Sequence, residues 1–365
     1  MIKKYKKHNM KRNIFYIIVV VVLLTVTSCR TQMTFKRVVA TPIMTITTEK
    51  SGSVTIYMAG SGVCTIDWGN GSVIETYMLE NHSYNWNQNL STIRKYTYSH
   101  DYSDTYPRII TITGENITHL NCSSNQLTNL DVGKNTKLIA LGCASNQLTS
   151  LDVSNNIALT ELNCVGNQLT SLNVSNNTAL TMLACSANQL TNLNVNNNVA
   201  LTALNCSSNE LFNLSVSENA LLKKLICDSN QLISLDVSKN IELNILFCER
   251  NQLTSLGLSE NFELTHLNFS FNRLTALDVS NNNKLFFLFC EKNQLTNLDV
   301  SKNISLGSLD CSGNQLTNTS LDNLFVTLHN SEGKTGGEKI FIGGNPGAAT
   351  CDRSIAEVKG WWVGN

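Results

Sequence analysis

The sequence predicts a mostly β protein: a parallel β-solenoid of ten 21-residue rungs, preceded by a small β-sandwich domain. The main observation is internal repetition, because from Ile117 onward one unit recurs every 21 residues without an insertion or a deletion. The second is the Leu-x-Cys alternation inside each unit, which is typical of a short strand with one buried face. One rung cannot bury its leucines alone, so we expect the rungs to stack in register and bury them against each other.

Three unbroken columns define the rung. One leucine column runs from Leu120 to Leu309, a second from Leu127 to Leu316, and an asparagine column from Asn125 to Asn314. The asparagine follows the strand, where its amide can pair with backbone groups that the turn leaves open. The second half of each unit has Leu-x-Val alternation and another asparagine column, Asn135 to Asn303, with no room for a full helix. We therefore expect extended or 3₁₀ segments on the convex side.

The repeat also carries a family resemblance. The clearest copy is Leu159 to Ala179, LTELNCVGNQLTSLNVSNNTA, and the copies share the pattern L-x-x-L-x-[C/L]-x-x-N-x-L, with Ile117 at its start in the first copy and Phe269 at the cysteine position in the eighth. This pattern resembles the leucine-rich-repeat signature, and the short regular units look like those of internalin-type bacterial surface proteins. The resemblance covers residues 115–320 and implies a right-handed horseshoe with a concave sheet. It implies a binding role without naming a ligand, since members of the family bind unrelated partners.

The first residues read as an export signal. A basic stretch leads into an apolar run from Ile14 to Leu24, which is too short to cross a bilayer as a helix. The sequence Val26-Thr27-Ser28-Cys29 resembles the lipobox of bacterial lipoproteins. We therefore expect a signal peptide at 1–28, lipidation of Cys29, a linker at 29–40 and anchoring in the bacterial envelope. An ordinary cleaved signal peptide is the alternative. The outer membrane is the expected location, and exposure at the cell surface stays open.

Charge argues against one class of partner. Removal of residues 1–28 takes away six of the 27 Lys and Arg residues and none of the 27 Asp and Glu residues. The remaining chain has a formal charge of −6 and no basic run. It therefore lacks the positive surface that nucleic acid requires.

Two flanking regions complete the expected domain organisation. In 41–114, alternating apolar segments are separated by turn signals, and Trp68-Gly69-Asn70-Gly71 is similar to the W-G-D-G element of PKD-type β-sandwich domains. The alternative is an irregular β-rich cap on the first rung. After Leu316 the period fails, and we interpret 321–365 as a C-terminal cap with a short helix, a last strand at 339–342 and aromatic residues that cover the final rung.

Nine cysteines share one position of the repeat. They are Cys122, Cys143, Cys164, Cys185, Cys206, Cys227, Cys248, Cys290 and Cys311. A straight column cannot surround a metal ion tetrahedrally, and neighbouring Cβ atoms at the rung spacing lie too far apart for disulfides. Phe269 occupies the eighth rung of the column, which also disfavours a required thiol chemistry. We therefore interpret these cysteines as small buried apolar residues and expect no metal or other cofactor. No role is assigned to Cys64 or Cys351.

The outward positions of the strands define a candidate ligand surface. They are mostly small or polar in the early rungs, and become aliphatic, aromatic and charged from the sixth rung on. The candidate binding residues are Lys224, Ile226, Ile245, Phe247, Glu249, His266, Phe287, Phe289 and Glu291. An exposed apolar patch with a charged rim is typical of an interface. The alternative is that these side chains only cover neighbouring rungs.

No sequence motif indicates catalysis. The chain has no G-x-S-x-G, no H-E-x-x-H and no phosphate-binding glycine loop. His119 and His266 lie seven rungs apart, too far to cooperate. We expect a non-enzymatic scaffold that binds a protein through its concave face, as an adhesin or host-interaction factor. A glycan- or envelope-polysaccharide-binding lipoprotein is the alternative, and a surface protein without a defined ligand is a third hypothesis.

Overall fold

The computed structural model describes residues 41–81, 96–331 and 337–365, and residues 41–365 form one compact unit. The predicted signal peptide at 1–28, Cys29 and the linker at 29–40 lie outside the described residues. Within the described part of the chain, no helix combines the length and apolar character that a membrane span requires.

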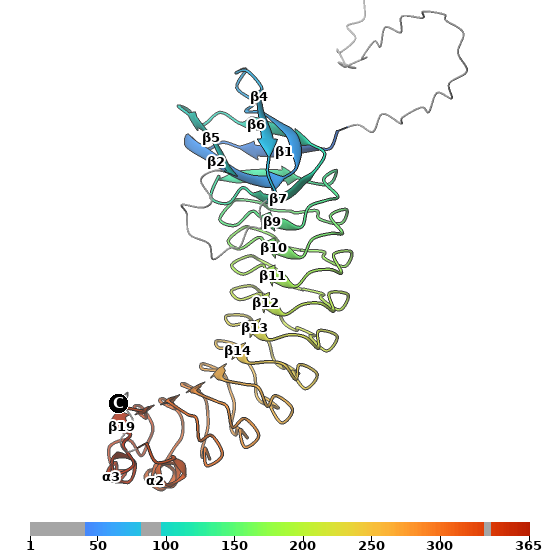
Figure 1. Cartoon of the computed structure of the whole chain (residues 1–365). Helices are drawn as coiled ribbons and strands as arrows, with labels where there is room; N and C mark the ends of the chain where they lie inside the picture. The colour runs from blue at the N-terminus through green and yellow to red at the C-terminus, as the bar shows by residue number, and fades with distance from the viewer. Residues whose placement is uncertain (1–40, 82–95, 332–336) are drawn as a thin grey trace, which may run out of the picture. The chain divides into compact units, whose positions relative to one another are not determined.

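The repeat forms a stack of parallel strands, one per turn (Figure 1). The strands are β7 (Ile117–Asn121), β9 (Ala140–Gly142), β10 (Glu161–Asn163), β11 (Met182–Ala184), β12 (Ala203–Asn205), β13 (Lys224–Ile226), β14 (Ile245–Phe247), β15 (His266–Asn268), β16 (Phe287–Phe289) and β17 (Ser308–Asp310). Each central leucine faces the leucine 21 residues on, so Leu204 pairs with Leu225 and Leu225 with Leu246. The ten predicted rungs are confirmed. The stack curves, and the sheet lies on its concave side (Figure 1).

The interior is filled by the predicted columns. Both leucine columns are buried along their length, as are the nine cysteines and Phe269. Because every turn presents the same residue at the same place, each side chain packs on its copy in the next turn. The convex half consists of turns and irregular segments, and residues 117–316, all described, contain no helix. The expectation of an almost all-β repeat is therefore confirmed.

The asparagine columns connect the turns. The amide of Asn209 donates to the carbonyl oxygens of Cys185 and Cys206, and its side-chain oxygen accepts the backbone N–H of Leu190 at 3.0 Å. In the second column, the Asn219 amide donates to the carbonyl oxygens of Val195 and Asn198. These bonds satisfy backbone groups that a buried turn would otherwise leave unpaired.

The N-terminal region is a sandwich of two sheets. Its strands are β1 (Ile43–Thr48), β2 (Gly52–Gly60), β3 (Gly62–Asp67), β4 (Glu75–Leu79), β5 (Thr97–Tyr102), β6 (Arg108–Gly114) and β8 (Leu127–Asp131). One sheet has the order β4-β3-β6-β1-β8, and β5 and β2 continue the solenoid sheet through β7. Trp68 is fully buried between the sheets and its backbone oxygen accepts the hydroxyl of Tyr102 at 2.6 Å. Both sheets therefore cross the expected boundary at residue 114.

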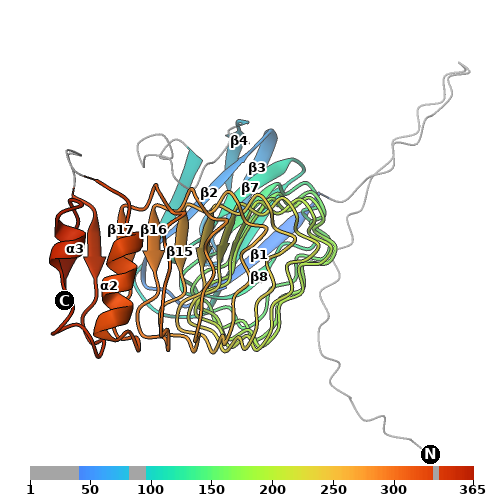
Figure 2. The ribbon, with the colours of Figure 1, turned by 90° about the horizontal axis from the view of Figure 1, so that it is seen from below.

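The solenoid sheet also continues at the C-terminal end. The chain adds α2 (Asn318–Thr327), β18 (Lys339–Phe341), α3 (Ser354–Glu357) and β19 (Trp362–Gly364). Ile340 pairs with Leu309, and Val363 pairs with Ile340, so two further parallel strands follow β17. Figure 2 shows the last strands side by side with α2 and α3 at this end of the stack. Trp361 is buried, as expected of an aromatic residue that covers the final rung, whereas Trp362 is exposed.

Candidate functional site

The strands β13–β16 bring seven of the nine predicted residues onto one face of the sheet, and Glu249 and Glu291 come two residues after the ends of β14 and β16. Lys224, Ile245, His266 and Phe287 form one row, and Ile226, Phe247, Asn268 and Phe289 form a second row. The leucine between each pair points inward, so both flanking side chains must point outward. Neighbouring members of a row lie on strands about 4.8 Å apart. We name the nine residues given above as candidates the concave patch.

The aromatic side chains of the concave patch contact one another. The Phe287 ring centroid lies 4.9 Å from that of His266 and 5.9 Å from that of Phe289. All three side chains are half-buried, so part of each ring remains open to solvent. Asn268 separates Phe247 from Phe289 in their row. The half-buried side chains of β14–β16 therefore form a continuous solvent-facing surface.

A band of carboxylates follows the strands. Asp228, Glu249 and Glu291 occupy the same position of three turns, and all are half-buried. Burial is the main cause that raises the pKa of Asp228, and burial followed by repulsion from Asp228 raises the pKa of Glu249. The Asn268 amide donates a hydrogen bond to Glu249. The surroundings of Asp228 and Glu249 therefore disfavour the charged form of both carboxyl groups.

The next residue of each turn has a left-handed backbone. Arg250, Phe271 and Lys292 have φ angles of 51°, 57° and 53°, and we name these three residues the ridge. The equivalent positions in other turns carry small residues: Ser124, Ser145, Gly166, Ala187, Ser208, Ser229, Gly313 and Gly344. The guanidinium of Arg250 lies 4.5 Å from the centroid of the Phe271 ring. Arg250 and Lys292 directly follow Glu249 and Glu291 in the chain, so the ridge borders the two carboxylates of the concave patch.

Several surface residues were not predicted. Phe286 is exposed beside the concave patch and its ring centroid lies 4.7 Å from that of Phe287. Glu161 and Met182 occupy the first row on β10 and β11, so the early rungs are less uniform than their sequence suggested. Phe341 and Trp362 form a second aromatic pair, 5.5 Å between centroids, which lines a hollow of ≈ 430 Å³ with Lys339 and Gly337.

The sequence contained only a weak indication that Phe341 lies on this sheet. Phe341 alternates with Ile340 as Phe289 alternates with Leu288, yet the 21-residue spacing that identifies the other rungs has ended.

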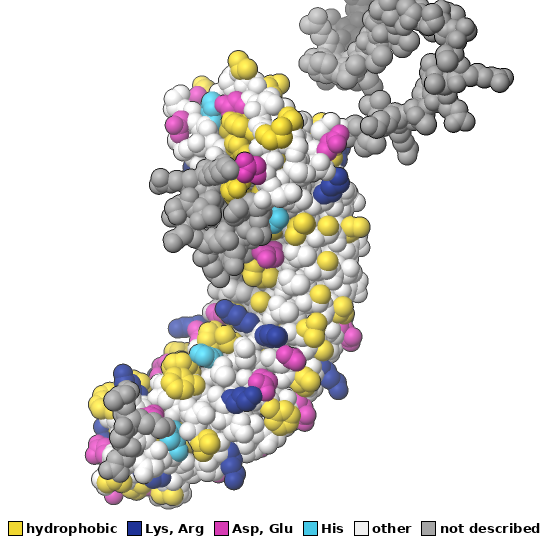
Figure 3. Space-filling model, viewed as in Figure 1, with side chains coloured by type: hydrophobic (Ala, Val, Ile, Leu, Met, Phe, Trp, Pro, Cys, Tyr) yellow, Lys and Arg dark blue, Asp and Glu magenta, His cyan; other side chains and the backbone are white. Residues whose placement is uncertain are grey.

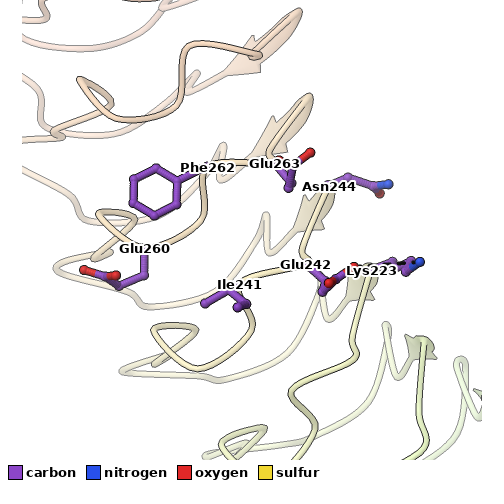
Figure 4. Close-up of a pocket in the computed structure, with 7 residues that line it drawn as sticks. All are labelled: Lys223, Ile241, Glu242, Asn244, Glu260, Phe262 and Glu263. Atoms are coloured by element: carbon purple, nitrogen blue, oxygen red, sulfur yellow. Dashed lines mark ion pairs between the residues drawn. The ribbon is translucent and has the colours of Figure 1, made fainter.

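A groove lies where the chain enters these strands, and it contains none of the nine predicted residues. It has a volume of ≈ 610 Å³ and is lined by Lys223, Ile241, Glu242, Asn244, Glu260, Phe262 and Glu263. Figure 4 shows Ile241 and Phe262 toward one end, on neighbouring turns, and Lys223 and Asn244 toward the other. The Nζ atom of Lys223 lies 3.8 Å from a Glu242 oxygen, so part of this charge is already paired within the groove. Figure 3 shows charged side chains gathered over this lower half of the solenoid.

The cysteine column offers no reactive thiol. Its members are free and buried, and burial raises the pKa of Cys122, Cys164 and Cys206 to about 12. A thiol in such surroundings stays protonated at neutral pH and is a poor nucleophile. In the described residues, no group of three or more His, Cys, Asp or Glu side chains could hold a metal ion.

Comparison with known proteins identifies the fold. The functional domain of InlJ from Listeria monocytogenes, a structure that includes a cysteine ladder, is 33% identical with a TM-score of 0.58, over 71% of this chain and 60% of that one. The leucine-rich-repeat protein LIC12759 of Leptospira interrogans is 26% identical with a TM-score of 0.55, over 58% of each chain. An internalin, inlF, from Listeria monocytogenes is 20% identical with a TM-score of 0.53, over 68% of this chain and 86% of that one.

The chain thus spans about 60% of the length of the first two of these structures. No family profile matches the sequence, and no curated protein matches it. The solenoid and its structural neighbours together show a leucine-rich-repeat fold.

Proposed function

We propose that this leucine-rich-repeat protein is an exported, lipid-anchored envelope protein that binds a protein partner through the concave patch. The observation that carries the proposal is the register of β13–β16, which gathers aliphatic and aromatic side chains from four consecutive turns on one solvent-facing surface. A surface of this kind, apolar in the middle and charged at the rim, has the anatomy of a protein interface. It serves binding rather than catalysis.

A protein partner fits the patch better than a small ligand. The patch extends across four neighbouring strands with its side chains partly open to solvent, whereas sites for small molecules are concave and enclose most of their ligand. Phe247 lies on β14, within the patch, and Phe287 and Phe289 lie on β16, its last strand; all three side chains are half-buried. Large aromatic side chains held in place by neighbours are the residues that most often dominate binding energy. The likeness to the InlJ domain and to an internalin supports a role in surface recognition.

The test replaces the two aromatic side chains of the second row. Phe247→Ala combined with Phe289→Ala is expected to abolish capture of a protein partner from host or envelope extracts by the immobilised protein. Met182→Ala, on the same face at β11, is the matched control and should leave capture unchanged. Circular dichroism checks that both variants are folded. Unchanged capture by the folded double variant contradicts the proposal.

The envelope anchor has its own test. Cys29→Ala removes the thiol that lipidation requires, so the variant should leave the membrane fraction. Protease treatment of whole cells then distinguishes an outward-facing protein, which is cleaved, from one that faces the periplasm, which is protected. Unchanged membrane association of Cys29→Ala contradicts lipid anchoring.

A second candidate function rests on Phe341 and Trp362. Their paired rings beside Lys339 form an aromatic platform at the end of the same sheet, and such platforms also stack on sugars. The alternative is therefore an envelope lipoprotein that binds glycans. A glycan array with the purified protein tests it: sugar binding that Trp362→Ala removes and Phe247→Ala does not would favour this function.

A further inference from the structure

The backbone of the ridge points to a second contact surface beside the concave patch. Arg250, Phe271 and Lys292 all adopt the left-handed conformation, in which bulky side chains are uncommon. Glycine or serine fills this position in most other turns, including both neighbours of the ridge, Ser229 and Gly313. Three consecutive turns therefore carry a bulky residue at a position whose left-handed backbone disfavours bulky side chains. Unfavourable backbone conformations of this kind persist more often at functional surfaces than elsewhere.

The ridge lies directly after the carboxylate positions in the chain. Arg250, Phe271 and Lys292 come one residue after Glu249, Ser270 and Glu291, which in turn follow the strands that carry the concave patch. The surface is thus organised in three parallel bands: an apolar band on the sheet, a carboxylate band, and a band made of the ridge. The turns of β14 and β16 carry all three bands, whereas the turn of β15 has Ser270 in place of a carboxylate. The turns of β7 and β9–β12 have no carboxylate at the position of Glu249 and only small residues at the ridge position.

The ridge presents two cations that form no close ion pair in the described residues, although the charge of Arg250 acts at longer range on Asp228 and Glu249. In the described residues, no carboxylate oxygen lies within 4.0 Å of the Arg250 guanidinium or the Lys292 ammonium, although four other ion pairs are present. Both side chains are exposed. The Lys292 stem lies against Gly313, where an added Cβ would meet the Lys292 Cδ at 2.7 Å. The Arg250 guanidinium packs on the Phe271 ring. Arg250 and Lys292 thus each pack on a neighbouring turn, and both side chains are exposed.

We propose that the binding surface continues from the concave patch over the carboxylate band onto the ridge, and that Arg250 and Lys292 contact an anionic side chain of the protein partner. This inference rests on the proposed function. The partner surface that fits has apolar anchors, then a lysine or arginine opposite Glu249 and Glu291, and then an aspartate or glutamate opposite the ridge. This order of charges is complementary to the three bands.

The experiment uses a phage-displayed library of random 12-residue peptides, selected on the full-length protein. Selected peptides are then measured on Arg250→Gly/Lys292→Gly, which removes both cations and gives the left-handed positions the residue that suits them. Arg250→Gln/Lys292→Gln keeps the stems and removes only the charges. Ser145→Gly/Ser208→Gly changes the same position in turns outside the ridge and is the matched control.

The expected result has two parts. Peptides that contain Asp or Glu should bind both ridge variants about five- to tenfold more weakly than the wild type, and the control should bind normally. The melting temperature of the glycine variant should equal or exceed that of the wild type, because the substitution relieves the backbone. Binding within twofold on both ridge variants overturns the inference. A clear fall in melting temperature with normal binding also overturns it, since the ridge then serves packing alone.

A parallel selection separates this inference from the proposed function. Phe247→Ala/Phe289→Ala should lose the selected peptides. If Phe247→Ala/Phe289→Ala loses the peptides and the ridge variants keep them, the inference about the ridge is wrong, and the proposed function of the concave patch is retained. If that variant keeps them, or if no peptide is selected on the wild type, the proposed function fails and the ridge fails with it.

Discussion

The side-chain oxygen of Asn230 accepts the backbone N–H of Leu211 at 3.1 Å and so joins one turn of the solenoid to the turn before it. The amide of the same side chain donates to the carbonyl oxygens of Cys206 and Cys227. The Asn240 amide, ten residues on, donates to the carbonyl oxygens of Val216 and Asn219, whereas its buried side-chain oxygen accepts no hydrogen bond from the described residues. The two asparagine columns therefore make unequal contributions to the stack.

This inequality predicts a difference in stability. Asn230→Ala should lower the free energy of unfolding by about 1–3 kcal/mol more than Asn240→Ala, because it also leaves the Leu211 N–H buried without an acceptor. Urea unfolding of the two variants, followed by circular dichroism, measures the difference. Equal losses, or a larger loss for Asn240→Ala, would show that the side-chain oxygen contributes nothing.

The repeat itself could be predicted from the sequence because its physics is local and periodic. Leu204, Leu225 and Leu246 recur at one spacing, and a buried column at that spacing allows only a stack in register. The concave patch followed from the same reasoning, since residues on either side of an inward leucine must point outward. What it binds could not be derived, because binding depends on a partner whose surface is absent from this sequence.

Features that break the period escaped prediction. β18 and β19 join the sheet with Ile340 opposite Leu309 and Val363 opposite Ile340, at separations of 31 and 23 residues instead of 21. The left-handed backbone conformation of the ridge residues could not be predicted from the sequence either. Arg250, Phe271 and Lys292 are poor candidates for that conformation by residue type, and only the identical turn geometry of all rungs imposes it on them.

Two glycines of the N-terminal region should respond differently to substitution. A Cβ on Gly69 would lie 2.4 Å from the backbone oxygen of Ile109 on β6, whereas a Cβ on Gly71 would meet nothing within 4 Å. Both residues have positive φ, so alanine at either position costs about 1 kcal/mol in backbone strain. Gly69→Ala must also push β6 aside and should cost at least about 2 kcal/mol more than Gly71→Ala. Thermal unfolding of both variants checks this, and similar melting temperatures would contradict it.

The cysteine column should make the fold sensitive to high pH. Burial raises the pKa of Cys164 from its ordinary value of 9.0 to about 12. Between these values the unfolded chain loses the thiol proton and the folded chain keeps it, so stability falls as the pH rises above about 9. Cys164→Ala should reduce this fall by up to about 1.4 kcal/mol per pH unit. Urea midpoints at pH 7, 9 and 11 measure it. Cys351→Ala, at a partly exposed site, is the control, and identical pH slopes for both variants would exclude this effect of burial.

Two aspartates should show opposite effects, and one of them borders the concave patch. Burial raises the pKa of Asp228, so its charge destabilises the fold at neutral pH. The backbone N–H of Ser238 donates to Asp236 at 2.9 Å and lowers the pKa of that carboxyl, so its charge stabilises the fold. Asp228→Asn should therefore raise the melting temperature at pH 7, and Asp236→Asn should lower it.

The sign of the pH dependence follows from the same shifts. As the pH falls through the raised pKa of Asp228, the folded state takes up the proton before the unfolded state does and gains stability, so the advantage of Asp228→Asn should shrink. The stabilisation by Asp236 is present at neutral pH and is lost as the pH falls through its lowered pKa, so Asp236→Asn should become harmless in acid. Melting curves from pH 7 to pH 3 distinguish the two. If Asp228→Asn instead lowers the melting temperature at pH 7, the carboxylate band contributes to folding, and its place beside the concave patch needs no functional explanation.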